Sequence, residues 1–122
     1  MNKHSLLLKD YSTIKGLNDI YTFKNYSEVK SFLNTNKHLI GVLNNSHKEI
    51  NKIFSGNIDY LSLEYHKDSE ENYECIFILI KTNISFSKSL ELLNKFYKEY
   101  WFNLSNDIKK IVGISIDNNS NL

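Results

Sequence analysis

The chain has no proline, alanine, arginine or glutamine, and it has only one cysteine and four glycines. Because arginine is absent, all 15 basic residues are lysines, and the side chain best suited to bidentate phosphate binding is missing. The single cysteine, Cys75, cannot form an intrachain disulfide. Its position inside an apolar stretch favours a small buried side chain over a reactive thiol. The scattered glycines exclude a glycine-rich phosphate-binding loop.

Length and charge restrict the classes of protein further. A chain of 122 residues is expected to form one domain, 1–122, with a single core. The formal net charge of +1 produces no long-range field, which argues against nucleic-acid and membrane partners. No apolar run approaches the roughly 20 residues that cross a bilayer, and Leu6-Leu7-Leu8 is too short for the core of a signal peptide. We therefore expect a cytoplasmic protein.

No residue pattern typical of catalysis or metal binding is present. The sequence lacks the nucleophile-elbow, phosphate-loop and dinucleotide-binding motifs. His66 could form an acid–base pair with Glu64 or Asp68, whereas His47 lies on an apolar helix face, where a core histidine is the simpler interpretation. We expect no catalytic, metal-binding or cofactor-binding residues, and hence no enzyme. The four histidines, none of them at a metal-ligand spacing, are His4, His38, His47 and His66.

The N-terminal half is predicted to be helical, because its apolar residues recur three or four positions apart. Ser27 is the expected N-cap of one helix, and Asn36 is expected to end it in the left-handed conformation. The turn residues Ser55-Gly56-Asn57 end the next helix. The segment 1–25 carries the weakest pattern. The predicted helices cover about 5–15, 26–36 and 37–54, with a break or short strand around Ile20, Tyr21 and Phe23.

The second half of the chain predicts a β-sheet. Residues 58–66 alternate between apolar and polar side chains, as in a half-buried strand whose Leu61, Leu63 and Tyr65 face the core. Residues 73–82 are apolar on both sides, which is typical of a central strand with both faces covered. We expect the long helix on one face and the N-terminal helices, or a second subunit, on the other. The polar connector 67–72 implies an antiparallel hairpin.

A long amphipathic helix and a last strand complete the predicted fold. The helix covers 87–103 with Ser85 or Ser87 as its N-cap, and a strand at 111–117 should follow it in a right-handed parallel crossover. The predicted class is α+β: a small, mainly antiparallel sheet of three main strands, one parallel β-α-β crossover, helices packed on the sheet, and a frayed tail at 118–122. The apolar stripe of the helix comprises Phe86, Leu90, Leu93, Tyr97, Tyr100, Trp101 and Leu104.

Aromatic residues crowd the end of this helix, at Tyr97, Tyr100, Trp101 and Phe102. Core packing is the simpler interpretation, and the alternative is an interface, because tyrosine and tryptophan dominate binding hot spots. Phe102 lies off the apolar stripe and is the residue that we most expect to be exposed. Aromatic rings beside lysines also suit stacking on single-stranded nucleic acid, which the near-neutral charge and the missing arginine disfavour.

Three parts of the sequence together resemble a family of small, largely uncharacterised bacterial proteins. They are Tyr26–Leu33 with Leu39-Ile40, then Leu61–Glu64, then Ser85–Leu104 followed by Val112–Asp117. In that family the long helix ends in an acid-rich segment with two tryptophans; Glu99 and Trp101 match it, while most of the acidic residues and one tryptophan have no counterpart. The resemblance spans about residues 26–117, and it implies the α+β fold and a protein without an obvious enzymatic site.

We therefore expect a non-catalytic protein-binding module of the antitoxin or immunity-protein type, which occludes a surface of a partner such as a toxin or nuclease. Its acidic loop, Asp68–Glu71 within the connector 67–72, would mimic phosphate toward a basic partner. Exposed sheet edges also predict self-association as a homodimer. One alternative is a small-molecule-binding domain or small enzyme with a pocket at the sheet edge that joins His66 or His38 to a carboxylate; another is a nucleic-acid-binding protein. The expected partner-binding residues are His66, Asp68, Glu70, Glu71, Tyr100, Trp101 and Phe102.

Overall fold

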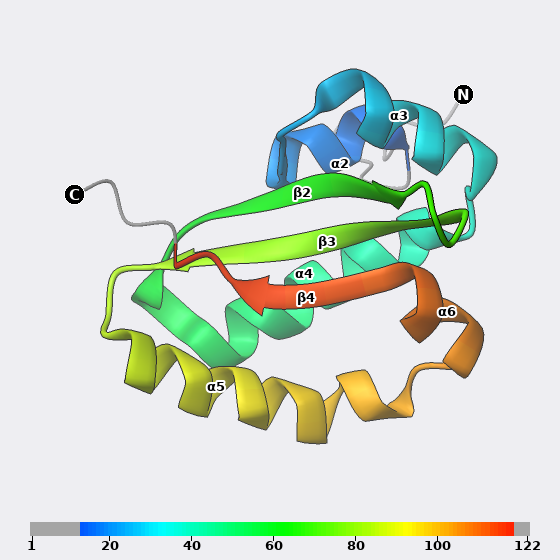
Figure 1. Ribbon diagram of the computed structural model, residues 1–122. Helices are drawn as coiled ribbons and strands as arrows, with labels where there is room; N and C mark the ends of the chain where they lie inside the picture. Colours follow the sequence, from blue (N-terminus) through cyan, green and yellow to red (C-terminus); the bar gives the residue numbers. More distant parts are fainter. Residues whose placement is uncertain (1–12, 119–122) are drawn as a thin grey trace, which may run out of the picture.

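The computed structural model describes residues 13–118, which form an α+β fold of five α-helices and a four-stranded sheet (Figure 1). The α+β class is thus confirmed. The helix predicted over about 5–15 lies mostly outside the described residues. Within them, the first helix is α2 (Ile14–Ile20), and it leads into β1 (Thr22–Phe23), where the sequence predicts a break or short strand.

The sheet is mixed rather than mainly antiparallel, which corrects the predicted fold class. Its strand order is β1-β2-β3-β4. β2 (Ile58–Asp68) and β3 (Tyr73–Thr82) form the predicted antiparallel hairpin, but β1 runs parallel to β2, and β4 (Val112–Ile116) runs parallel to β3. β3 is a central strand and the β3–β4 connection is a parallel crossover, as predicted. The parallel β1 was not counted among the main strands because two residues leave no alternation to detect.

Two further helices follow α2 before the hairpin, α3 (Tyr26–Thr35) and α4 (Leu39–Phe54), and their bounds are within two residues of those predicted. The predicted caps of α3 are wrong. The helix begins after Asn25, so Ser27 lies within its first turn and is not the N-cap. Asn36 does end the helix, but at φ −126°, outside the left-handed region, and its side-chain amide donates a hydrogen bond back to the helix.

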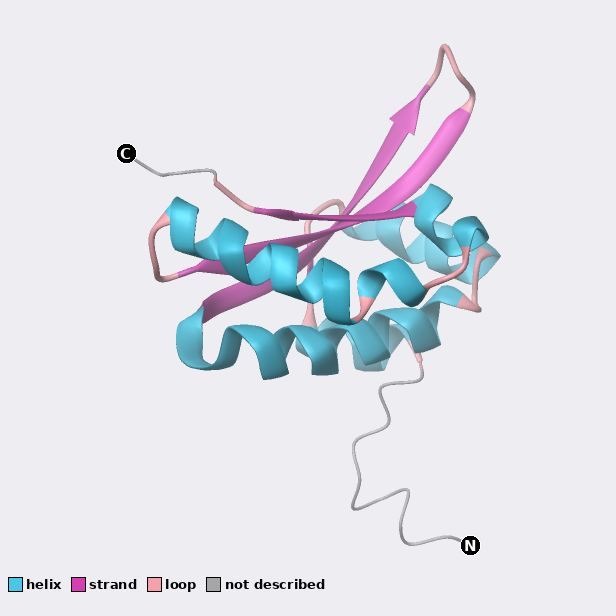
Figure 2. Cartoon of the chain, turned by 90° about the horizontal axis from the view of Figure 1, so that it is seen from below, coloured by secondary structure: helices cyan, strands magenta, loops and turns pink. Residues whose placement is uncertain are grey.

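The prediction that helices cover both faces of the sheet is wrong, because the described helices gather on one side of it (Figures 1 and 2). Alternate strand residues point to opposite faces. On the other face, Phe77 and Leu79 of β3 are only half-buried, and the Phe77 ring is covered by the edge of the His66 ring, 4.8 Å away between centroids. The buried residues on the helix-facing side of the sheet are Leu61, Leu63, Ile76, Ile78, Ile80, Val112 and Ile114.

The long helix after the hairpin ends earlier than predicted. α5 (Phe86–Glu99) is followed by a 3₁₀ turn, η2 (Trp101–Asn103), and by a short helix that the sequence did not reveal, α6 (Asn106–Ile111). Ser85 is the N-cap, as one of the two predicted candidates, and its hydroxyl accepts a hydrogen bond from the Lys88 N–H at 3.1 Å. The segment 87–103 is therefore a helix and a turn rather than one helix.

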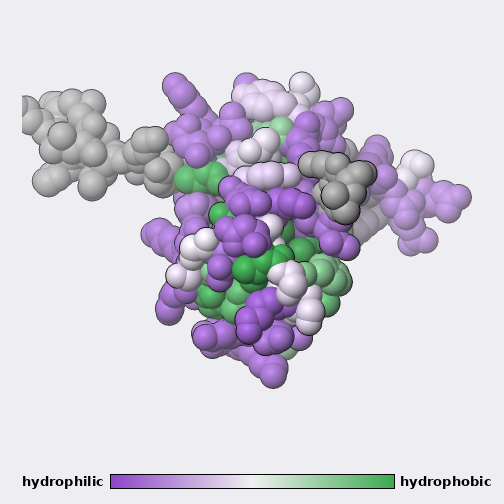
Figure 3. All heavy atoms as spheres, turned by 90° about the vertical axis from the view of Figure 1, so that its left-hand side faces the viewer, coloured by the Kyte–Doolittle hydropathy of each residue, from purple (hydrophilic) through white to green (hydrophobic). Residues whose placement is uncertain are grey.

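The apolar stripe predicted for this helix fits only in part. Leu93 and Trp101 are buried, but Phe86 and Leu90 remain 47% and 38% exposed, while Phe96, which the stripe omits, is fully buried. The buried residues of α5 are Ser89, Leu93 and Phe96, so the helix turns a face to the core that is rotated from the predicted stripe. The side of the molecule where α4 ends and α5 begins consequently shows hydrophobic surface among hydrophilic side chains (Figure 3).

Candidate functional site

Negative charge is concentrated at the end of the molecule formed by the β2–β3 hairpin. From Glu64 to Glu74 the chain carries five carboxylates and one lysine, although the whole chain has a formal net charge of +1. Every residue from His66 to Glu74 is exposed, and the hairpin extends beyond the helices (Figure 2). Residues 64–74, together with Glu28 of α3, are called the acidic end below.

The tip of the hairpin is shaped by one of its own carboxylates. Asp68 Oδ1 accepts hydrogen bonds from the backbone N–H groups of Glu70, at 3.0 Å, and Glu71, at 3.3 Å. Asn72 completes the turn with φ 52°, a left-handed conformation that asparagine adopts more readily than most residues. Asp68 therefore has a structural role in addition to its charge, whereas Glu70 and Glu71 contribute their side chains as exposed charge.

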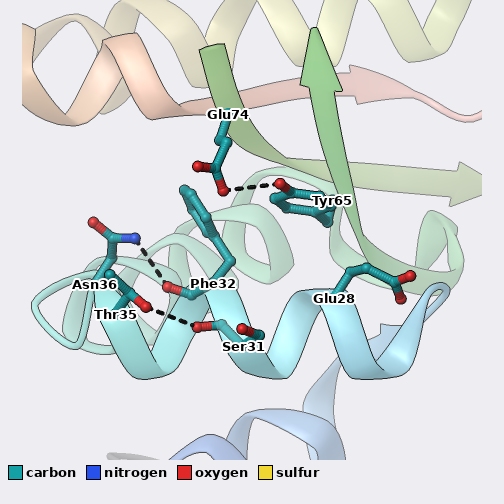
Figure 4. Close-up of a pocket in the computed structure, with 7 residues that line it drawn as sticks. All are labelled: Glu28, Ser31, Phe32, Thr35, Asn36, Tyr65 and Glu74. Carbon is teal, nitrogen blue, oxygen red and sulfur yellow. Dashed lines mark hydrogen bonds between the residues drawn. The ribbon is translucent and has the colours of Figure 1, made fainter. Parts of the chain in front are cut away.

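A cavity of about 230 Å³ lies between α3 and the two strands, close to the pair Lys67 and Glu74, where the projecting part of the hairpin begins (Figure 4). This place is called the base of the hairpin. It combines two carboxylates with aromatic surface and small polar groups. The Thr35 hydroxyl and the Asn36 amide are turned back on α3, where they donate to the carbonyls of Ser31, at 3.2 Å, and Phe32, at 2.9 Å. The residues that line the cavity are Glu28, Ser31, Phe32, Thr35, Asn36, Tyr65 and Glu74.

Tyr65 connects the two strands inside this cavity. Its hydroxyl donates a hydrogen bond to Glu74 Oε1 at 2.8 Å (Figure 4). This hydrogen bond raises the pKa of the Tyr65 phenol, with smaller contributions from desolvation and from the charges of Glu74, Cys75 and Glu28. The phenol therefore keeps its proton, and its hydrogen bond holds the Glu74 carboxylate in one place.

The Asn25 side chain fixes Tyr65 from the outer edge of β2. Asn25 Nδ2 donates to the Tyr65 carbonyl and Asn25 Oδ1 accepts from the Tyr65 N–H, both at 2.9 Å. β1 pairs with only Ser62 and Leu63 of β2, and the Lys24 N–H extends this pairing to the Leu63 carbonyl. Asn25 thus replaces the next strand residue, so that α3 and β2 are joined where the cavity forms.

On the opposite face of the hairpin, Glu64 and His66 form the pair that the sequence offered as an acid–base alternative. His66 Nε2 lies 3.1 Å from Glu64 Oε1. Cys75, the cross-strand neighbour of His66, is buried, and burial raises the pKa of its thiol, only partly offset by a hydrogen bond with Tyr73. A neutral, buried thiol is a poor nucleophile. The cavity at the hairpin base is lined by neither His66 nor His38.

The predicted aromatic contact residues at the end of α5 divide between core and surface. Trp101 is only 6% exposed and packs against Phe96, with 5.8 Å between ring centroids. Tyr100 is half-buried. Phe102 is 62% exposed, and its ring stacks on that of Tyr97 at an interplanar angle of 9°. Among these aromatic residues, Phe102 therefore presents the largest surface to a partner.

Sequence reasoning found the charged tip of the hairpin but missed the cavity beneath it. The alternation in 58–66 correctly predicts Tyr65 on the core face of β2, yet the Tyr65 hydroxyl lies among polar groups. The available signal was Glu74, a carboxylate on the core-facing side of β3, beyond the last buried isoleucine, Ile76. A charged residue at such a position indicates that the core ends and an open site begins there.

Comparison with known proteins gives no matching family model, no matching curated protein and no matching solved structure. Within residues 13–118, no three histidine, cysteine, aspartate or glutamate side chains are grouped closely enough to hold a metal ion. Among the helices of the same part of the chain, none has the length and apolar character needed to cross a membrane.

Proposed function

We propose that the chain is a non-catalytic protein-binding module whose acidic end covers a basic surface of a partner protein. The observation that carries this proposal is the uneven distribution of charge. Five carboxylates and one lysine lie on an exposed hairpin, in a chain whose formal net charge is +1. The remainder of the chain is consequently net positive. The hairpin is a local negative patch, which the net charge of +1 conceals because it sums both regions.

The form of the hairpin supports contact with a large partner. Because the hairpin extends beyond the helices (Figure 2), it can enter a groove that the rest of the domain cannot. Carboxylates at such a tip complement a lysine- and arginine-rich surface, which raises the rate of association and favours one orientation. A toxin or nuclease that binds phosphate groups has a surface of this kind, and its occlusion is the mode of action proposed here, as for an antitoxin or immunity protein.

The proposal is tested by neutralising the hairpin charge without breaking its turn. In the triple variant Asp68→Asn, Glu70→Gln, Glu71→Gln, the Oδ1 acceptor at position 68 is retained, so the turn can still form. Tagged wild-type and variant chains are used to capture proteins from a lysate of the source cells. We expect the wild type to retain a basic protein that elutes as salt is raised, and the triple variant to lose most of it.

A matched control removes three other exposed carboxylates: Asp59→Asn, Glu91→Gln and Glu99→Gln. It changes the net charge by the same amount and should retain the partner. A separate Phe102→Ser variant tests the exposed aromatic residue as a second contact. Equal capture by the wild type and by the triple hairpin variant would show that the acidic end is not the binding surface, and capture of acidic proteins alone would contradict the expected charge of the partner.

A further inference from the structure

The cavity at the base of the hairpin has the chemistry of a receptor for one cationic side chain. Glu28 and Glu74 provide negative charge, while Phe32 and Tyr65 provide aromatic surface. We propose that this cavity receives a lysine or arginine side chain of the partner, with the aliphatic stem against the rings and the charged group at the Glu74 carboxylate. Glu28, whose carboxylate is directed away from Glu74 (Figure 4), adds to the negative charge around the cavity. This inference rests on the proposed function, and it names the residue type that the acidic end recognises.

In the described part of the chain the two carboxylates form no ion pair, although Lys67 is the cross-strand neighbour of Glu74. None of the residues that line the cavity is a lysine. Lys30, on the same helix as Glu28, has its ammonium group 6.0 Å from the centre of the Tyr26 ring, which does not line the cavity. Negative charge in the cavity is therefore available to a ligand.

The size of the cavity fits a single side chain. At about 230 Å³ it is smaller than the roughly 300–1,000 Å³ of pockets that enclose drug-sized molecules. Glu28, Ser31, Thr35 and Glu74 are exposed, so the cavity is accessible from solvent. Its aromatic part suits the stem of a lysine or arginine, since these side chains bury their methylene groups on apolar surface and keep the charged group near water.

The receptor is fixed before any ligand arrives. Asn25 holds the backbone of Tyr65 through two hydrogen bonds, and the Tyr65 hydroxyl holds the Glu74 carboxylate. Because these contacts exist in the free protein, little ordering is required on binding, which favours affinity. The lining polar groups of Thr35 and Asn36 are bonded to α3 and do not compete for the carboxylates.

The test uses small probes and needs no partner. Amide resonances of the ¹⁵N-labelled chain are followed by two-dimensional NMR during titration with N-acetyl-lysine methylamide, N-acetyl-arginine methylamide and the neutral N-acetyl-norleucine methylamide. We expect both cationic probes to shift the amides of residues 28–36, 65 and 74, and the neutral probe to bind at least fivefold more weakly. Putrescine is titrated in parallel to distinguish a side chain from a free diamine.

Two variants test whether binding of the cationic probes depends on the charges of Glu28 and Glu74. The double variant Glu28→Gln, Glu74→Gln keeps an oxygen acceptor for the Tyr65 hydroxyl, and it should weaken binding of the cationic probes about 2- to 30-fold, the product of two exposed charge contacts. The matched control Glu91→Gln, Glu99→Gln removes two charges from α5 and should bind as the wild type does.

Four results would overturn the inference: equal binding of the neutral probe, shifts confined to other amides, unchanged affinity in the double variant, or putrescine binding more than tenfold tighter than the lysine probe. The last result would assign the cavity to a free amine. Failure here is separable from failure of the proposed function. The double variant leaves the charges at positions 68, 70 and 71 in place, and the capture experiment with the hairpin variant does not depend on the probes.

Discussion

Replacing Asn25 by alanine removes a side chain that completes the outer edge of β2. Its amide makes two hydrogen bonds of 2.9 Å to the backbone N–H and carbonyl of Tyr65. It makes no side-chain capping bond to α3, although it occupies the N-cap position. The substitution therefore tests the edge contact, with little contribution from helix capping.

The expected loss follows from the number and setting of these bonds. An intramolecular hydrogen bond contributes about 0.5–1.5 kcal/mol, so two give about 1–3 kcal/mol of unfolding free energy. The site is partly buried, and water that reaches Tyr65 after the substitution would place the value in the lower half of this range. At roughly 4 °C per kcal/mol for a domain of this size, the melting temperature should fall by about 4–8 °C.

The assay is urea denaturation followed by circular dichroism, combined with hydrogen exchange at the Tyr65 amide, which should lose protection. Asn34→Ala is the matched control, because Asn34 is exposed on the same helix and alanine favours helix formation. Asn25→Asp keeps the acceptor but turns a carboxylate oxygen toward the Tyr65 carbonyl, so it should also destabilise the chain at neutral pH. Equal stability of Asn25→Ala and Asn34→Ala, with Tyr65 still protected, would refute the assignment.

Three further predictions concern packing and protonation. A Cβ at Gly113 would lie 2.3 Å from the Phe77 ring, so Gly113→Ala should cost about 1–3 kcal/mol in urea denaturation, whereas Gly41→Ala, in open space within α4, should stabilise by about 0.5–1 kcal/mol. Trp101→Ala should cost about 3–5 kcal/mol, and Phe102→Ala should stay within about 0.5 kcal/mol, because only the first ring is buried. Burial lowers the pKa of His47, so below about pH 6.5 the unfolded chain binds a proton more readily than the folded chain does. The contribution of His47 to stability should therefore be complete above about pH 6.5 and fall below it. In thermal melts at about pH 5 and pH 7.5, His47→Gln should reduce this pH dependence.

The sequence predicted the elements that have a regular pattern. Alternation in 58–66 and the continuous apolar run in 73–82 identified the hairpin and its central strand, because strand periodicity depends only on local side chains. The helices α3 and α4 were also predicted from a local pattern, the recurrence of apolar residues three or four positions apart. The parallel β3–β4 crossover followed from the order strand, helix, strand. These features require no knowledge of distant contacts.

The features that sequence reasoning missed depend on contacts between distant residues. The outer face of β3 is apolar at Phe77 and Leu79, and apolar character alone cannot distinguish cover by a helix from cover by neighbours on the sheet. Here the His66 ring lies against Phe77, which in turn lies over Gly113. Likewise, the end of α5 is set by how Trp101 enters the core through a 3₁₀ turn, which no helical pattern encodes.

The candidate site was predicted only as charge. Asp68, Glu70 and Glu71 are visible in the sequence because they are adjacent, and an exposed acidic turn needs no long-range contact. The cavity combines Glu28 with Glu74, and the Asn25–Tyr65 contact that shapes it joins positions 40 residues apart. Such a pairing becomes apparent only when α3 has been placed against the hairpin.

Asn25 links the stability of the fold to the proposed recognition. β2 has eleven residues, and β1 pairs with only two of them, so a long stretch of its outer edge has no strand partner in the described part of the chain. Unpaired edges invite association with other strands, and the Asn25 amide occupies this edge at Tyr65, beside the cavity. Replacing Asn25 should therefore lower both the unfolding free energy and the affinity for the cationic probes. Neutralising Glu28 and Glu74 should lower only the affinity for the probes. Measuring stability and probe affinity for both variants shows whether the cavity binds the probes through the charges of Glu28 and Glu74. Unchanged affinity in the Glu28 and Glu74 variant would leave the cavity as only a structural consequence of the contact between Asn25 and Tyr65.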